Sequence, residues 1–103
     1  MAKRRPIFEF HQEAILEARE AADWYAARSV DAALKFKIEL RRAEELVTKR
    51  PDAWTPYLHG TRCFKLERFP YALVYIERGD RIIGLAVAHL KRRPGYWRDR
   101  LSD

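Results

Sequence analysis

The stretch RFPYALVYIERGDRIIGLAVAHLKRRPGYWRDR, residues 68–100, decides the fold that we predict for this chain. Residues 71–78 and 81–89 are rich in aliphatic and aromatic side chains, and only Gly79 and Asp80 separate them. A two-residue loop of this kind favours a tight turn between antiparallel strands. Apolar residues occupy both parities of residues 82–88, which is typical of an inner strand buried on both faces. A basic, aromatic tail follows directly.

The residues before this hairpin predict one strand and two helices. Residues 6–10 (PIFEF) have the composition of a short opening strand. Residues 11–28 place apolar side chains at helical spacing: Ile15, Ala18, Ala22 and Tyr25. Residues 29–50 predict a second helix, with Ser29 as its N-cap and Pro51 as its stop. Its apolar stripe is formed by Ala33, Phe36, Leu40, Ala43 and Val47.

The remaining segments complete the expected architecture. Residues 52–61 contain Pro56 and Gly60 and show no period, so they predict a connecting loop. Residues 62–68 alternate as a half-exposed strand does. We therefore predict a single α+β domain over residues 1–103, in the order strand, helix, helix, strand, strand, strand. The helical hairpin should pack on one face of a small antiparallel sheet and leave part of the other face open, with a short basic C-terminal tail.

Charge is distributed unevenly along the 103 residues, whose formal net charge is +6. Lys and Arg balance Asp and Glu over residues 11–50, whereas basic residues are in excess at both ends, with Lys3, Arg4 and Arg5 at the first. A basic surface attracts anions such as nucleic acid or an acidic protein segment.

Several function classes are disfavoured by what the sequence lacks. Cys63 is the only cysteine, and it forms no metal-ligand spacing with His11, His59 or His89, so we expect no metal and no cofactor. The longest apolar run, residues 82–88, is far shorter than the roughly 20 residues that cross a bilayer. The N-terminus lacks the apolar segment of a secretory signal. We expect a cytoplasmic protein that does not act at membranes.

Two motifs in the last third resemble those of a known family. They are Arg68-Phe69-Pro70-Tyr71-Ala72-Leu73-Val74-Tyr75, and Ala86-Val87-Ala88-His89 followed by Arg93-Pro94-Gly95-Tyr96-Trp97. With the segment Glu20-Ala21-Ala22-Asp23-Trp24-Tyr25, they make the chain similar to the RelE/ParE superfamily of bacterial toxins, which includes plasmid stabilisation proteins. The resemblance implies a toxin of a type II toxin-antitoxin module that inhibits growth. It also implies a cognate acidic antitoxin as partner, in a toxin-antitoxin hetero-oligomer.

The superfamily has two modes of action, and both are open at this point. RelE-like members are ribosome-dependent mRNA endonucleases (mRNA interferases), whereas ParE-like members inhibit DNA gyrase. For metal-independent RNA cleavage, the resemblance and the chemistry select as catalytic residues His89, Arg68, Lys65 and Tyr96. The residues expected to bind nucleic acid or another target are Lys91, Arg92, Arg93, Arg98 and Trp97.

Ala72 argues against the nuclease. RelE-like nucleases commonly carry a tyrosine-arginine pair where this chain has Tyr71 and Ala72. Arg68 could supply the missing charge from the preceding turn, but a displacement of about 1 Å in a catalytic group is costly. We therefore favour a gyrase-type binding inhibitor, with a RelE-like nuclease as the alternative. A degenerate toxin that only binds its antitoxin is a third, weaker option.

Some roles stay open within the tail. His89 shares parity with Ile83, Leu85 and Val87, so it is either a structural residue at the sheet edge or a catalytic one. Tyr96 and Trp97 either stack on a base or pin the tail to the sheet. Residues 94 and 95 form either a turn before a short helix or part of a loose arm.

Overall fold

A computed structural model of the chain describes residues 5–103, so Lys3 and Arg4 of the N-terminal basic cluster lie outside it. The elements are β1 (Ile7–Phe10), α1 (Gln12–Ala26), α2 (Val30–Lys49), β2 (Thr55–Pro56), β3 (Arg62–Lys65), β4 (Tyr71–Arg78) and β5 (Arg81–His89). Two short 3-10 helices cover Leu58–Gly60 and Arg98–Ser102. The expected order is confirmed. β2 and the first 3-10 helix are additions within the predicted loop, and β3 ends three residues earlier than predicted.

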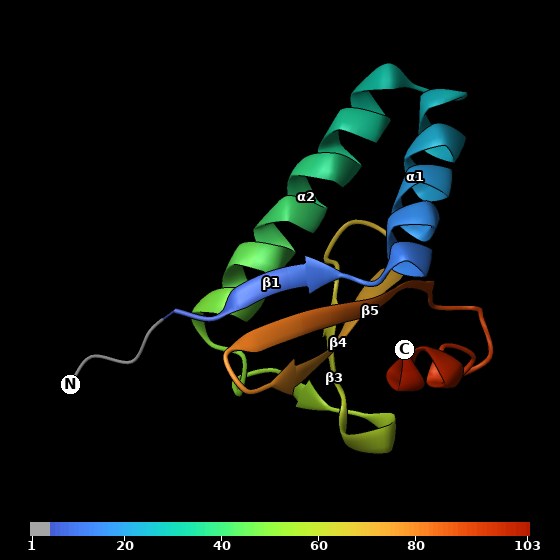
Figure 1. Ribbon diagram of the computed structural model, residues 1–103. Coiled ribbons are helices and arrows are strands. Elements are labelled where there is room, and N and C mark those ends of the chain that lie inside the picture. Colours follow the sequence, from blue (N-terminus) through green and yellow to red (C-terminus); the bar gives the residue numbers. More distant parts are fainter. Residues whose placement is uncertain (1–4) are drawn as a thin grey trace.

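The strands form one sheet in the order β1-β5-β4-β3-β2. β5 lies between β1 and β4, as its apolar composition predicted, and it pairs antiparallel with β4 across the Gly79-Asp80 turn. β1 pairs parallel with β5, so the sheet is mixed rather than antiparallel throughout (Figure 1). The long connection between β1 and β5, which includes both helices, supplies the crossover that a parallel pair requires.

The two helices form a hairpin over one face of the sheet (Figure 1). The Ser29 hydroxyl accepts a hydrogen bond from the Ala32 N–H at 3.2 Å, which confirms the predicted N-cap of α2. The predicted stripe of α2 is buried throughout. In α1 the buried residues are Ala14, Ala21 and Ala22, whereas Ile15 is 39% exposed. The predicted stripe of α1 is therefore wrong at Ile15, because α1 turns small residues toward both α2 and β5.

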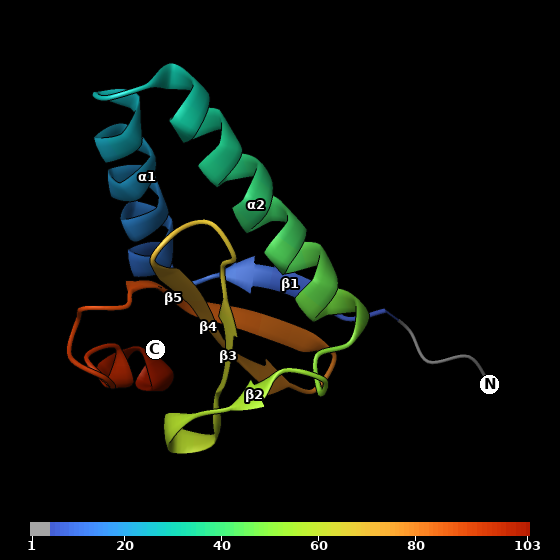
Figure 2. The same cartoon turned by 180° about the vertical axis from the view of Figure 1, so that it is seen from behind.

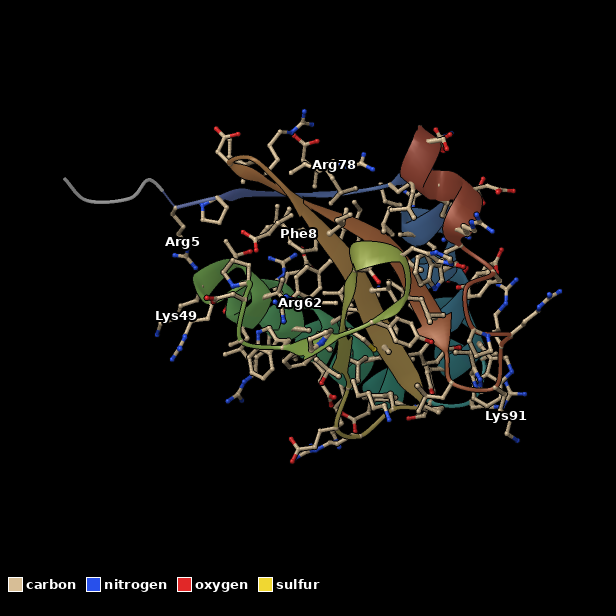
Figure 3. The ribbon with its side chains drawn as sticks, turned by 90° about the horizontal axis from the view of Figure 1, so that it is seen from below. Arg5, Phe8, Lys49, Arg62, Arg78 and Lys91 are labelled. Atoms are coloured by element: carbon tan, nitrogen blue, oxygen red, sulfur yellow. The ribbon has the colours of Figure 1, made fainter. Side chains whose placement is uncertain are left out.

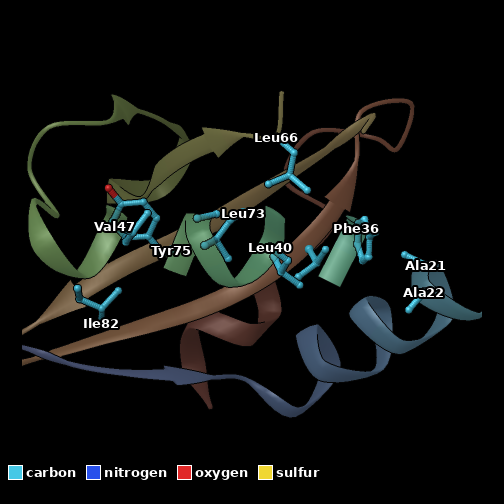
Figure 4. Close-up of a cluster of buried hydrophobic side chains, with 11 residues drawn as sticks. Ala21, Ala22, Phe36, Leu40, Val47, Leu66, Leu73, Tyr75 and Ile82 are labelled. Carbon is cyan, nitrogen blue, oxygen red and sulfur yellow. The ribbon is translucent and has the colours of Figure 1, made fainter. Parts of the chain in front are cut away.

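The main core lies between the helical hairpin and the sheet (Figure 4). Phe36, Leu40 and Val47 of α2 pack against sheet residues that include Leu73 and Tyr75. The Tyr75 hydroxyl donates a hydrogen bond of 2.6 Å to the Pro51 carbonyl, so the one polar atom of this buried side chain is satisfied. Burial raises the pKa of Tyr75 to about 12.

A second, smaller core lies on the opposite face of the sheet, where Trp97 packs on Val74, Leu85 and Ala86. The chain turns at Gly95, whose φ is +81°, and then enters the 3-10 helix Arg98–Ser102. Figure 2 shows this C-terminal segment beside β4 and β5, below the start of α1 and away from α2. The tail is therefore not a loose arm, and it covers a large part of the sheet face that we expected to be open.

Candidate functional site

An irregularity in β5 decides which side chains share a face. Val74 pairs with Ala86 and Tyr75 pairs with Gly84, so Leu85 is an extra residue in the ladder. Such a bulge reverses the alternation of side chains beyond it. Leu85 packs in the core on the tail side of the sheet, whereas Val87 packs in the core under the helices. His89 follows the parity of Val87, so the expectation that it shares a face with Ile83 and Leu85 is wrong.

His89 borders a pocket of about 400 Å³ between α1 and the ends of β4 and β5. We call this cavity the α1 pocket; its walls include Trp24, Tyr25, Tyr71 and His89. The ring centroids of Tyr71 and His89 are 5.0 Å apart, in an edge-to-face arrangement. His89 Nδ1 accepts a hydrogen bond of 3.0 Å from the Lys91 N–H. His89 thus helps to shape the turn after β5 and also faces a cavity.

Lys65 and Arg68, the predicted catalytic cations, lie elsewhere. Lys65 is exposed and pairs with Ala72, whose neighbour Tyr71 faces the helices. Because successive residues of a strand point to opposite faces, Lys65 and His89 belong to opposite faces of the sheet. Arg68 is exposed in the turn between β3 and β4, where its N–H donates to Glu39 Oε2 at 3.2 Å. Lys65 is therefore separated from His89 by the sheet, and neither Lys65 nor Arg68 lines the α1 pocket.

Glu17 of α1 receives several donors from the end of the chain. The Tyr96 hydroxyl donates to Glu17 at 2.6 Å, and two N–H groups of Arg100 donate to it at 2.8 and 3.0 Å. The Val87 N–H donates to it at 3.1 Å, while Arg100 also donates to the Leu85 carbonyl at 2.9 Å. β1 pairs with β5 only as far as Phe10 and Gly84. Beyond that point, Glu17 and Arg100 supply the hydrogen-bond partners of the Val87 N–H and the Leu85 carbonyl. We call these three side chains, Glu17, Tyr96 and Arg100, the tail clamp.

The electrostatics of the tail clamp follow from its burial. The side chains of Glu17 and Arg100 are only 10% and 13% exposed. Burial, together with the hydrogen bond to Glu17, raises the pKa of Tyr96. Burial opposes the charge on Arg100, but the Glu17 carboxylate outweighs it and raises the pKa of Arg100. The Tyr96 hydroxyl, which we predicted as a proton donor in catalysis, is engaged by Glu17 instead.

The predicted target-binding residues of the tail divide into two groups. Lys91, Arg93 and Arg98 are exposed, and Figure 3 shows Lys91 pointing outward at one end of the molecule. The Arg92 guanidinium lies 3.7 Å from the centroid of the Tyr96 ring and 3.4 Å from Glu17. Trp97 is only 1% exposed. Its ring completes the second core, so the structure agrees with the alternative in which Trp97 pins the tail to the sheet, and the ring is not exposed to a target.

The outer face of α2 carries apolar side chains that the core does not use. Val30, Leu34 and Ile38 recur every four residues and are 70%, 53% and 67% exposed. We call them the outer α2 stripe. The charged residues next to it are Lys35, Lys37, Arg41 and Arg42, together with Asp31, which pairs with Lys35 at 2.9 Å. An exposed apolar patch with a polar rim is typical of a protein interaction site.

Sequence reasoning missed both the tail clamp and the outer α2 stripe. The burial of Glu17 could have been predicted from the sequence. It stands three residues after Ala14 and four before Ala21, which is the spacing of the buried face of α1. A charged residue at a core position predicts a buried partner. The stripe was visible as the repeat Val30, Leu34, Ile38, but its exposure depends on which face of α2 meets the sheet.

Residues 5–103 contain neither a candidate metal site nor a helix that could span a membrane. No group of three or more His, Cys, Asp and Glu side chains in this part of the chain is placed to hold a metal ion. Neither described helix combines the length and apolar character that a membrane crossing requires.

Comparison with known proteins agrees with the fold. Residues 8–94 match the model of the family described as ParE toxin of type II toxin-antitoxin system, parDE. A chain of the solved structure titled "Chromosomal ParDE TA system from P. aeruginosa" is similar with a TM-score of 0.74 and 19% identity. The similarity covers 82% of this chain and 96% of that chain. No curated protein matches. Since the family model covers most of its length, the chain belongs to the ParE toxin family of type II toxin-antitoxin systems.

Proposed function

We propose that this toxin arrests growth by binding and inhibiting DNA gyrase, and that it does not cleave RNA. The observation that carries the proposal is the separation of the residues a nuclease would need. Lys65 and His89 belong to opposite faces of the sheet. Ala72, which is 3% exposed, offers no charge.

The chemistry of RNA cleavage makes this separation decisive for the proposal. A base, a cation and a proton donor must surround one phosphate within hydrogen-bond reach. In this chain the hydroxyl of Tyr96 already donates to Glu17, so it is not available to a leaving group. A binding inhibitor needs none of these groups to converge. It needs an exposed surface, and Lys91, Arg93 and Arg98 offer cations on one.

Conditional expression with two parallel readouts tests this function. We expect loss of negative supercoiling in a reporter plasmid and no new mRNA 5′ ends, and we expect the purified toxin to inhibit gyrase in vitro. His89→Ala should still arrest growth, whereas the double variant Lys91→Gln/Arg93→Gln should inhibit gyrase less. Lys49→Gln, a charge change at the far end of α2, is the matched control. New mRNA 5′ ends without a change in supercoiling would overturn the proposal.

We further propose that the antitoxin docks an acidic amphipathic segment on the outer α2 stripe. The stripe spans two helical turns, which suits the i, i+4, i+8 side chains of one apolar helix face. The basic residues around it and the net charge of +6 complement an acidic partner. A segment that folds on binding would also remove Val30, Leu34 and Ile38 from water.

Binding of the co-expressed antitoxin to toxin variants tests this surface. Leu34→Asp should weaken binding by about tenfold or more, equivalent to about 1.4 kcal/mol, because it places a carboxylate at the centre of the stripe. Leu58→Asp is the control, since Leu58 is also partly exposed, at 40%, but lies outside α2. Calorimetric titration measures both affinities. Equal affinity of the Leu34→Asp variant and the wild type would show that the antitoxin binds elsewhere.

A further inference from the structure

The α1 pocket is bordered by aromatic rings from α1, β4 and β5. Trp24 is 52% exposed, and its orientation is held by Arg28, whose guanidinium carbon lies 3.5 Å from the ring centroid. Arg28 also donates a hydrogen bond of 2.9 Å to the Trp24 carbonyl, which fixes the pair to the end of α1. Tyr71 and His89 contribute an aromatic pair, with ring centroids 5.0 Å apart. The cavity of about 400 Å³ lies within the range of small-molecule sites.

The polar groups around the α1 pocket differ in their availability. Glu17 is engaged by the tail clamp. Glu20 also lines the pocket, and within residues 5–103 its carboxylate has no hydrogen bond or ion pair. Lys91 and Arg93 flank Arg92, itself a lining residue, and both are exposed without an acidic partner in the described part of the chain. Aromatic rings and a free carboxylate thus line the pocket, and two exposed cations stand next in sequence to its lining residue Arg92.

We propose that the α1 pocket binds a nucleotide, with the base against Trp24 and Tyr71 and the phosphate at Lys91 and Arg93. Bases stack on aromatic side chains whatever their sequence. Glu20 can accept hydrogen bonds from the amino group of guanine, adenine or cytosine, which uracil lacks. The cations neutralise phosphate. A cationic side chain would also suit aromatic walls and a carboxylate, but Lys91, Arg92 and Arg93 would repel it.

This inference goes beyond gyrase inhibition and does not depend on it. The same chemistry is offered by a free mononucleotide and by an unpaired nucleotide at the end or within a loop of a nucleic acid strand. The fluorescence of Trp24 reports binding of either kind of nucleotide, because Trp24 is the exposed tryptophan of the pocket, whereas Trp97 is buried in the second core. Trp54→Phe removes the remaining indole without touching the pocket, so quenching in that background arises at Trp24.

Fluorescence titration of the Trp54→Phe protein with GMP, AMP, CMP and UMP tests the proposal. We expect saturable quenching, with UMP binding most weakly. Glu20→Gln should weaken GMP binding by about tenfold and reduce the preference over UMP. Lys91→Gln/Arg93→Gln should weaken GMP binding by about tenfold but leave guanosine, which has no phosphate, unchanged. Glu45→Gln, on the exposed face of α2, is the matched control for folding and charge.

A short single-stranded oligonucleotide, titrated beside its component mononucleotides, distinguishes the two sources. Tighter binding of the oligonucleotide assigns the pocket to nucleic acid strands, and equal or weaker binding assigns it to free nucleotides. Absence of saturable quenching by all these ligands at millimolar concentrations overturns the proposal, as does quenching by N-acetylarginine amide alone. Circular dichroism confirms that each variant is folded. Growth arrest is not a readout, so failure here leaves the proposed inhibition of gyrase untouched.

Discussion

At the scale of single residues, Glu17 is the residue of α1 that holds the C-terminal tail in place. Its carboxylate accepts from Tyr96, Arg100 and the Val87 backbone, which joins α1, β5 and the tail at one point. A buried charge is tolerated only when it is paired and fully hydrogen-bonded, and Glu17 meets both conditions. The tail is therefore positioned by hydrogen bonds and ion pairs to Glu17 as well as by apolar packing.

Glu17→Gln should lower the free energy of unfolding by about 3 kcal/mol, because it leaves the nearly buried Arg100 guanidinium without its counter-charge. Urea denaturation measures the change. Glu45→Gln, which alters an exposed carboxylate of α2, should stay within about 0.5 kcal/mol of the wild type. Equal losses of unfolding free energy in the two variants would mean that the ion pair between Glu17 and Arg100 does not stabilise the fold.

Tyr75 predicts a loss of stability at alkaline pH. Burial raises its pKa from 10.0 to about 12, so the folded state favours the neutral phenol. This contribution is complete below pH 10 and is lost as the pH rises from 10 to about 12. Tyr75→Phe should cost about 1 kcal/mol at neutral pH, because the Pro51 carbonyl loses its donor. The difference in unfolding free energy between the two proteins should shrink as the pH rises from 10 to about 12. A constant difference would show that the pKa of Tyr75 is not raised in the folded state.

At the scale of elements, the approach of β1 to β5 depends on Gly84. A Cβ at this position would lie 2.7 Å from Phe10 Cδ1 and 2.9 Å from Phe8 Cζ, closer than packed carbons approach. Both phenylalanines belong to β1 and pack against the main core. The glycine therefore gives two aromatic rings room above β5, immediately before the bulge at Leu85.

Gly84→Ala should lower the free energy of unfolding by about 1–3 kcal/mol, because Phe10 cannot move far without displacing β1. Thermal unfolding followed by circular dichroism measures it. Phe10→Leu in the Gly84→Ala background should recover part of the loss, since the smaller side chain admits the new methyl group. A second substitution that only adds to the damage would place the strain elsewhere.

At the scale of the whole molecule, the sheet is covered on both sides. The helical hairpin buries one face, and the tail buries much of the other through Trp97. Arg78 of β4 donates a hydrogen bond of 2.6 Å to the Leu101 carbonyl, and Asp103 pairs with His11 at the start of α1. Figure 3 shows Arg78 near the C-terminal 3-10 helix. The C-terminal residues are therefore part of the globule.

Trp97→Ala should lower the free energy of unfolding by about 3–5 kcal/mol, as other large-to-small core changes do. It should also expose Val74 and Leu85, so binding of a hydrophobic dye should increase while the helical signal in circular dichroism persists. Trp24→Ala is the matched control, since Trp24 is 52% exposed. If removing the Trp97 ring cost no more than removing that of Trp24, the second core would not contribute to stability.

The extent of sequence-based prediction differed between the fold and the site. The two helices, the hairpin around Gly79 and the inner position of β5 were predicted, because each follows from spacing between near neighbours. The face of His89 was not, because one extra residue, Leu85, reverses the alternation that the prediction assumed. The parallel pairing of β1 also escaped prediction, since it depends on segments distant in the chain. The burial of Trp97 agrees with one of the two alternatives that the sequence left open.

The sequence by itself determined the α+β order, the basic charge and the membership in the toxin family, because helical period, turn residues and motifs are local properties. Only the tertiary structure decided that Lys65 and His89 lie on opposite faces of the sheet. It also decided that Glu17 accepts hydrogen bonds from Tyr96 and Arg100, and that aromatic rings line the α1 pocket. These are relations between side chains remote in sequence. They are set by the register of the sheet and by the packing of α1 and the tail on β5, which no local pattern encodes.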